Sequence, residues 1–165
     1  MKKSKNTPTV LLRKKHFKQE LKASCVAAAA RMVLDYHGII GVSEAELRRI
    51  LKTKPKGTHL INFLFLKDEK RWNLDVELSQ STSAELFTTI STLQIPAIVF
   101  VDTAYFPHWD ESAAHVVLVV GYDEENVIIN DPVTDEKEIS IPATKFFTAW
   151  AKNQYYMVVI KKKKG

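Results

Sequence analysis

The segment that most restricts the fold of this chain is the apolar run at residues 114–122, AHVVLVVGY. Its apolar residues fall on both faces of an extended chain, a pattern typical of a central strand in a sheet. The sequence Asp123-Glu124-Glu125 can turn the chain, and residues 126–130 are expected to return it as a second strand. An antiparallel hairpin is therefore expected at the centre of the molecule.

The remaining elements are predicted from hydrophobic periodicity and from capping and breaking residues. Two capping boxes, Ser43 with Glu46 and Thr82 with Glu85, mark helix starts. Helices are expected at 25–37, 44–52, 58–71, 83–93 and 142–152. Strands are expected at 9–12, 73–78, 96–101, 114–122, 126–130, 136–141 and 155–160. Helices thus dominate the first half and antiparallel strands the second, which predicts an α+β fold with a helical lobe packed on the sheet.

Charge is distributed unevenly along the chain. Residues 1–22 hold eight Lys/Arg and one acid, and residues 161–164 are all lysine, so residues 23–160 carry a net charge of −6. We expect a disordered basic tail at 1–8, one domain at 9–160 and a basic tail at 161–165. These termini could make weak contact with an anionic surface, although solubilising tails are the favoured interpretation and no nucleic-acid motif accompanies them.

The cysteine content and the hydropathy limit the cellular context. One cysteine excludes an internal disulfide and fits a reducing compartment, so a cytoplasmic location is expected. The basic N-terminus lacks the apolar core of a secretory signal, and no apolar run of about 18 residues predicts a membrane span.

The only cysteine, Cys25, lies at the start of an Ala-rich helix. Ser24 precedes it as an expected N-cap residue, and Gly38 is a natural helix stop. The partial positive charge of a helix N-terminus favours a thiolate over a thiol. A lone cysteine is more often a small buried apolar residue, so the catalytic interpretation needs partners elsewhere in the chain.

A histidine and an aspartate are the candidate partners. If residues 122 and 126 close the hairpin, Asp131 lies opposite Val117, and His115 lies two residues along on the same face. Asp131 could then accept a hydrogen bond from the imidazole. A register that differs by one residue would instead make Asn130 the candidate.

Gln19 precedes the cysteine by six residues and could stabilise an oxyanion through its amide, together with backbone N–H groups at the helix start. The combined scheme has Cys25 as nucleophile, His115 as base and acid, and Asp131 as the residue that orients the imidazole. The alternative for Gln19 is an exposed polar residue in a connection.

Several stretches match a known family. They are Gln19, Ser24-Cys25 with the Ala-rich helix, LDYHG at 34–38, VSEAEL at 42–47, Gly57-Thr58, IPAIV at 95–99, AHVVLVVGYD at 114–123 and NDP at 130–132. With these, residues 17–160 resemble the C39 peptidases, papain-like cysteine peptidases known from bacteriocin exporters. The resemblance implies a papain-like fold, a peptide or protein substrate and the same roles for Gln19, Cys25, His115 and Asp131.

Two departures from the family pattern affect the expected function. Val26 stands where the family usually has glycine, and could crowd the acyl-binding cleft. The chain also holds no transporter region, so a stand-alone C39-like domain is expected, and the leader-type substrate cut after two glycines carries over weakly. Other acyl-transfer enzymes (amidase, deamidase or transpeptidase) and a catalytically silent peptide-binding module stay open.

The loop at 105–109, YFPHW, precedes the strand that carries His115. It could form a wall of the substrate cleft, or it could cap the core. Neither His59 nor His108 has a predicted role. No spacing of metal ligands and no glycine-rich phosphate loop is present, so no metal or cofactor is expected.

Overall fold

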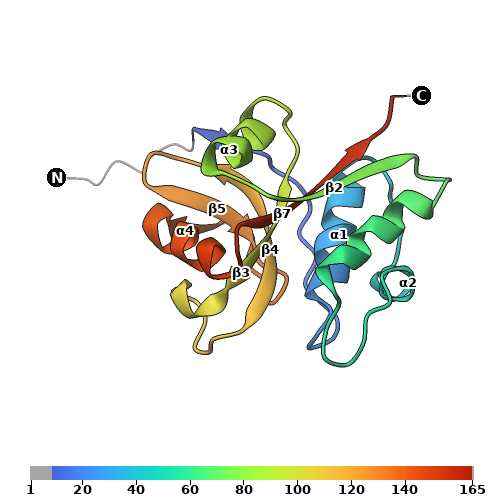
Figure 1. Cartoon of the computed structure of the whole chain (residues 1–165), viewed down its shortest axis with the longest axis horizontal. Helices are drawn as coiled ribbons and strands as arrows, with labels where there is room; N and C mark the ends of the chain where they lie inside the picture. Colours follow the sequence, from blue (N-terminus) through green and yellow to red (C-terminus); the bar gives the residue numbers. More distant parts are fainter. Residues whose placement is uncertain (1–8, 165) are drawn as a thin grey trace.

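The computed structural model describes residues 9–164, and the predicted N-terminal tail at 1–8 lies outside the described residues. One antiparallel sheet in the order β2-β7-β3-β4-β5-β6 organises the chain, and β1 pairs with the end of β4 (Figure 1). The strands are β1 (Val10–Leu11), β2 (Leu74–Gln80), β3 (Ala97–Asp102), β4 (Ala114–Tyr122), β5 (Asn126–Asn130), β6 (Ile139–Pro142) and β7 (Tyr156–Lys162). The expected hairpin of β4 and β5 is present, and β4 lies inside the sheet.

Helices cover both faces of the sheet. They are α1 (Cys25–Tyr36), α2 (Glu44–Ile50), α3 (Ser83–Ser91), α4 (Ala143–Lys152) and two 3₁₀ helices, η1 (Leu60–Asp68) and η2 (Thr103–Tyr105). Alternate residues of β4 enter two separate cores. Val116, Leu118 and Val120 pack in the core that includes α1, α2 and η1, whereas Val117 and Val119 pack in the core that includes α3 and α4. This arrangement confirms the predicted α+β class and explains why β4 is apolar on both faces.

The helix predicted at 58–71 is wrong in type, because this segment forms the 3₁₀ helix η1. Leu60, Phe63 and Leu66 recur every three residues and pack in the core that includes α1 and α2, called the α1 core below. This period is that of a 3₁₀ helix, which brings residues i and i+3 onto one side. The helical periodicity of the sequence was therefore real, but its period was three rather than 3.6.

Two predicted strand boundaries also need correction. The strand expected at 136–141 begins only at Ile139, since the chain first forms an irregular segment in which Glu138 has φ 57°. The strand expected at 155–160 continues through Lys162. Lys161 and Lys162 pair with Asp75 and Leu74 of β2, so two of the four C-terminal lysines belong to the sheet rather than to a tail.

The register of β4 and β5 carries Asp131 to the site. The predicted closing pair is wrong, because Tyr122 pairs with Val127. The Asp123 N–H donates to the Asn126 carbonyl at 3.0 Å within the turn. A bulge between Val119 and Gly121 then shifts the pairing by one residue, and Leu118 faces Asn130. Beyond the bulge the register equals the predicted one, so Asp131 follows the strand on the expected side.

β1 lies beside the far end of β4, where it pairs with Gly121 and Tyr122. The Val10 carbonyl oxygen occupies the space that a Cβ at residue 121 would need, so this close approach requires glycine. Within residues 9–164, none of the helices combines the length and the apolar composition needed to cross a bilayer.

Candidate active site

Cys25 is the first residue of α1, as predicted, and its side chain is half-buried at the edge of the α1 core. Ser24 occupies the N-cap position, but the expected capping bond is absent. Its hydroxyl instead accepts from the Leu21 N–H and donates to the Leu21 carbonyl, both at 3.0 Å. Ser24 therefore fixes the turn that leads into α1 and leaves the helix start open beside the thiol.

The structure brings His115 and Asp131 together. His115 is the second residue of β4 and is 5% exposed, and Asp131 directly follows β5 and is fully buried. The His115 Nε2 donates to Asp131 Oδ1 at 2.6 Å. This bond leaves Nδ1 as the imidazole nitrogen available to Cys25. Asn130, the alternative candidate, accepts from the Glu138 N–H through its side chain instead.

The electrostatics of the three groups favour a charged pair. Burial raises the pKa of the Cys25 thiol. The net shift is nevertheless downward, because the thiolate is stabilised by a hydrogen bond from His115, by the imidazolium charge and by the N–H groups of Val116 and Val26. Burial lowers the pKa of His115, yet its bonds to Asp131 and Cys25 raise that pKa to about 9. The two shifts act together, because each charged group favours the charged form of the other, a thiolate beside an imidazolium.

Asp131 accepts four hydrogen bonds, more than the sequence predicted. Oδ1 accepts from His115 and, at 3.0 Å, from the Val133 N–H. Oδ2 accepts from His108 Nε2 at 2.7 Å and from Trp109 Nε1 at 2.8 Å. Burial raises the pKa of Asp131, but the bonds from His108, His115 and Trp109 hold it well below its usual range. The role of His108 was missed, and only its position just before the His115 strand could have suggested it.

Gln19 lines the same cavity as Cys25. Its backbone N–H donates to the Pro132 carbonyl at 2.7 Å, which ties it to the segment after Asp131. Its side-chain Nε2 donates to the Leu21 and Lys22 carbonyls, both at 2.9 Å. The amide therefore lies at the predicted place, but both of its donor hydrogens already have acceptors, so it would have to release one to reach an oxyanion.

A buried carboxylate supports the segment that carries Gln19. Glu44, the first residue of α2, is 1% exposed and accepts from the Glu20 N–H at 2.8 Å. Arg48, one turn along α2, forms ion pairs with both Glu44 and Glu20. The capping box of Ser43 and Glu46 is confirmed by a 3.1 Å bond. The contact of Glu44 with residue 20 was not predicted.

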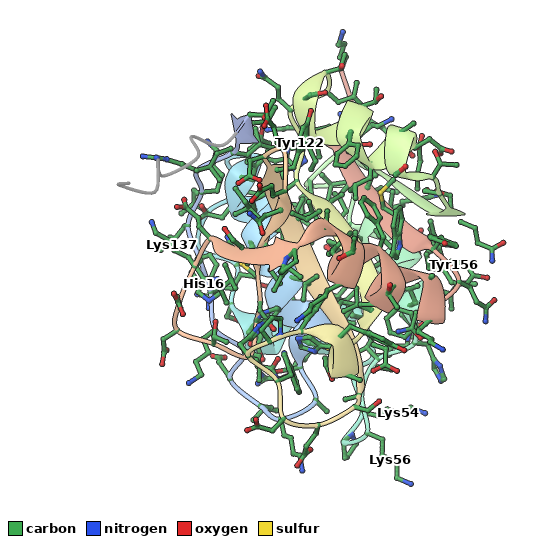
Figure 2. All side chains as sticks on the ribbon, turned by 90° about the vertical axis from the view of Figure 1, so that its left-hand side faces the viewer. His16, Lys54, Lys56, Tyr122, Lys137 and Tyr156 are labelled. Carbon is green, nitrogen blue, oxygen red and sulfur yellow. The ribbon has the colours of Figure 1, made fainter. Side chains whose placement is uncertain are left out.

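An open cavity of about 650 Å³ lies over Cys25 and His115. Its walls are the segment before α1, the turn at 54–57 with η1, the ends of β3 and β4, and the loop at 109–113. Lys54 and Lys56 project into solvent from that turn, while His16 lies beside the loop at 132–137 (Figure 2), where its Nε2 donates to the Thr134 carbonyl. The side chain of Val26 packs in the α1 core and is 4% exposed, so it contributes to the wall without closing the cavity.

The loop at 105–109 packs on the core and also lines the cavity. Phe106 is buried in the core beside α4, and Tyr105 and Trp109 pack against that core. Trp109 also lines the cavity, with its ring 4.9 Å from that of His115. Within the described part of the chain, no group of three or more His, Cys, Asp or Glu side chains is placed to hold a metal ion.

Comparisons with known proteins identify the family and the fold of the chain. Residues 13–164 match the model of the Peptidase C39 family. A Bacillus anthracis protein described as C39-like superimposes with a TM-score of 0.74 at 18% identity, covering 97% of this chain and 100% of the other. A double-glycine motif protease from an AMS/PCAT transporter, solved with its leader peptide, gives 0.71 at 18% identity over 96% and 98% of the two chains.

The peptidase domain of Streptococcus ComA, a bifunctional ABC transporter of a quorum-sensing pathway, gives a TM-score of 0.70 at 20% identity, covering 92% of this chain and all of the other. No curated protein matches the chain. The structural similarities show a shared fold, and the family model covers most of the sequence. The chain therefore belongs to the Peptidase C39 family.

Proposed function

We propose that this protein is a cysteine peptidase that hydrolyses a peptide bond through a thioester, with Cys25, His115 and Asp131 as its catalytic residues. The observation that carries the proposal is that Cys25 and His115 line one open cavity, while His115 is bonded to the buried carboxylate of Asp131. Membership of a peptidase family supports the reaction class. The leader peptide bound to the double-glycine protease supports a peptide as substrate.

In the acylation step the Cys25 thiolate attacks the carbonyl carbon, and the carbonyl oxygen becomes an oxyanion. The first turn of a helix leaves backbone N–H groups without internal acceptors, so the Cys25 N–H is available to this oxyanion. The Gln19 amide supplies a second donor once it releases the Leu21 or the Lys22 carbonyl. When the C–N bond breaks, His115 gives its proton to the departing amine, and the acyl group stays on sulfur as a thioester.

In the deacylation step His115, now neutral, removes a proton from water as the water oxygen attacks the thioester carbon. The carbon–sulfur bond then breaks, the acyl group leaves as a carboxylic acid, and the thiolate–imidazolium pair is restored. Asp131 accepts from His115 Nε2 throughout, so Nδ1 keeps its direction toward the sulfur.

The presence of one cysteine makes the decisive experiment simple, because any thiol-directed reagent reports on Cys25 alone. A library of quenched fluorescent peptides, including double-glycine sequences, would be screened before and after stoichiometric alkylation. We expect cleavage that disappears in proportion to the alkylated fraction. The Cys25→Ala variant controls for labelling elsewhere, and cleavage that survives complete alkylation would refute the proposal.

The pH dependence of kcat/KM should follow the charged pair. Below the lowered pKa of Cys25 the sulfur carries a proton and cannot attack. Above about 9 the imidazolium loses the proton that the departing amine needs. A bell-shaped profile with its alkaline limb near pH 9 is expected, measured with a substrate that does not titrate in this range. A profile that keeps rising beyond pH 10 would contradict this assignment.

Replacing Gln19 with alanine should lower kcat about 10²-fold, the usual effect of losing one oxyanion donor. KM should change little, because the amide acts on charge that develops only in the transition state. The Gln19→Glu variant is the matched test, since a carboxylate of the same length repels an oxyanion. A rise in KM of the same size, with no change in kcat, would assign Gln19 to substrate binding instead.

A further inference from the structure

A second histidine shares the carboxylate of Asp131 with His115. The His108 Nε2 donates to Oδ2 at 2.7 Å, and His115 Nε2 donates to Oδ1 at 2.6 Å. The Trp109 indole also donates to Oδ2, at 2.8 Å. The two carboxylate oxygens therefore have different partners. Oδ1 faces His115, and Oδ2 accepts from the loop that precedes β4.

Packing holds these two donors in place. The His108 ring stacks on Phe106 with centroids 5.7 Å apart and planes at 19°, and Phe106 in turn stacks on Phe146 of α4. The Trp109 ring rests against the ring of His115. His108 is therefore positioned by the core through two aromatic rings, and its contact with Asp131 is part of the packed interior.

The surroundings of His108 indicate which ring nitrogen faces the carboxylate. Its Nδ1 atom is buried and has no hydrogen-bond partner among residues 9–164. The other ring nitrogen, Nε2, therefore makes the polar contact of this side chain and donates its hydrogen to Asp131 Oδ2.

We propose that His108, together with Trp109, is a positioning residue: the two donors hold Asp131 Oδ2 so that Oδ1 stays directed at His115. This inference rests on the proposed peptidase function. If the donors are lost, Oδ2 becomes an unsatisfied buried anion. The carboxylate then rotates or takes up a proton, the imidazolium loses its acceptor, and the Cys25 thiolate is less favoured.

Other titratable groups also lie on the elements that pack around Asp131. Cys25 of α1 contacts His115, and Glu111 lines the cavity from the loop before β4. On the segment after Asp131, His16 bonds the Thr134 carbonyl and Lys18 pairs with Asp135. Among the described residues, only His108 and His115 donate to the carboxylate itself through titratable side chains.

The test measures the midpoint pH for alkylation of Cys25 by iodoacetamide in the parent protein and in three variants. His108→Ala removes one donor, Trp109→Phe removes the indole N–H but keeps a ring over His115, and His108→Gln restores a neutral donor at similar reach. His59→Ala, which changes an exposed histidine that makes no bond to Asp131, is the matched control. Circular dichroism and melting temperature confirm that each variant is folded.

We expect His108→Ala and Trp109→Phe each to raise the midpoint by about one pH unit, the scale of one hydrogen bond to an ionised group. His108→Gln should return it to the parent value, and His59→Ala should not move it. Unchanged midpoints in folded His108→Ala and Trp109→Phe would overturn the proposal, as would an equal shift in His108→Gln and His108→Ala. If His108→Ala does not fold, the other two variants decide.

The same data separate this inference from the proposed function. A parent midpoint at the ordinary thiol value of about 8.5 would refute the thiolate–imidazolium pair and with it both proposals. A low parent midpoint that neither donor variant moves would leave the peptidase proposal intact and refute only the role of His108 and Trp109.

Discussion

Replacing His115 with alanine is expected to remove the low-pH reactivity of Cys25 and to lower kcat/KM by about 10⁴-fold or more. The thiol would lose the hydrogen bond and the charge that lower its pKa, while the burial that raises its pKa would remain. Its alkylation midpoint should therefore rise to about 8.5 or above. The departing amine would also lose its proton donor, so the two effects on turnover combine.

The measurement is the rate of iodoacetamide alkylation from pH 4 to 10, combined with cleavage of the best library peptide. His59→Ala, which removes an exposed histidine, should match the parent in both assays. His115→Gln offers a neutral side chain of similar reach that cannot carry the proton, and should behave like the alanine variant. Rapid alkylation of folded His115→Ala at pH 5–6 would mean that the helix start alone stabilises the thiolate.

The hairpin shows how far local sequence determined the position of the site. The apolar run, the acidic turn and the placement of His115 and Asp131 on one face were all predictable. The closing pair was wrong by one residue, and the bulge at Val120 compensated for that error. A bulge depends on how neighbouring strands twist and pack, which includes the approach of β1 to Gly121. The predicted register near Asp131 is therefore correct, although the predicted closing pair of the turn is wrong.

The contacts that the sequence did not predict join segments far apart in the chain. Glu44 bonds the backbone at residue 20, and His108 bonds Asp131, at separations of 24 and 23 residues. No periodicity links such pairs, because each depends on where loops fold back onto the sheet. Gln19 is intermediate, since its position beside Cys25 was expected whereas its bonds to the Leu21 and Lys22 carbonyls were not.

Replacing Asp131 with alanine should weaken both turnover and folding. Without the carboxylate, kcat should fall about 10³- to 10⁴-fold, because the imidazole loses its fixed orientation and its stabilised charge. The free energy of unfolding should fall by about 3–5 kcal/mol, the usual cost of removing one partner from a buried charged contact. Four donors would lose their acceptor: His108, His115, Trp109 and the Val133 N–H.

The Asp131→Asn variant separates the two effects. An asparagine side chain has one acceptor oxygen and one donor amide, whereas both oxygens of Asp131 accept. If the oxygen faces His115, the amide opposes the His108 and Trp109 donors, and if the side chain flips, it opposes His115 instead. We therefore expect stability to fall in either orientation. Turnover should remain above that of Asp131→Ala only if the oxygen faces His115.

Urea unfolding and peptide cleavage of the same samples would measure both quantities, with Asp135→Asn as a control at an exposed carboxylate that pairs only with Lys18 among the described residues. That control should change the free energy of unfolding by less than about 1 kcal/mol, as is usual for an exposed ion pair. An Asp131→Asn protein as stable as the parent would contradict the four-donor arrangement. It would mean that at least one of the donors to Oδ2 does not hold the carboxylate in solution.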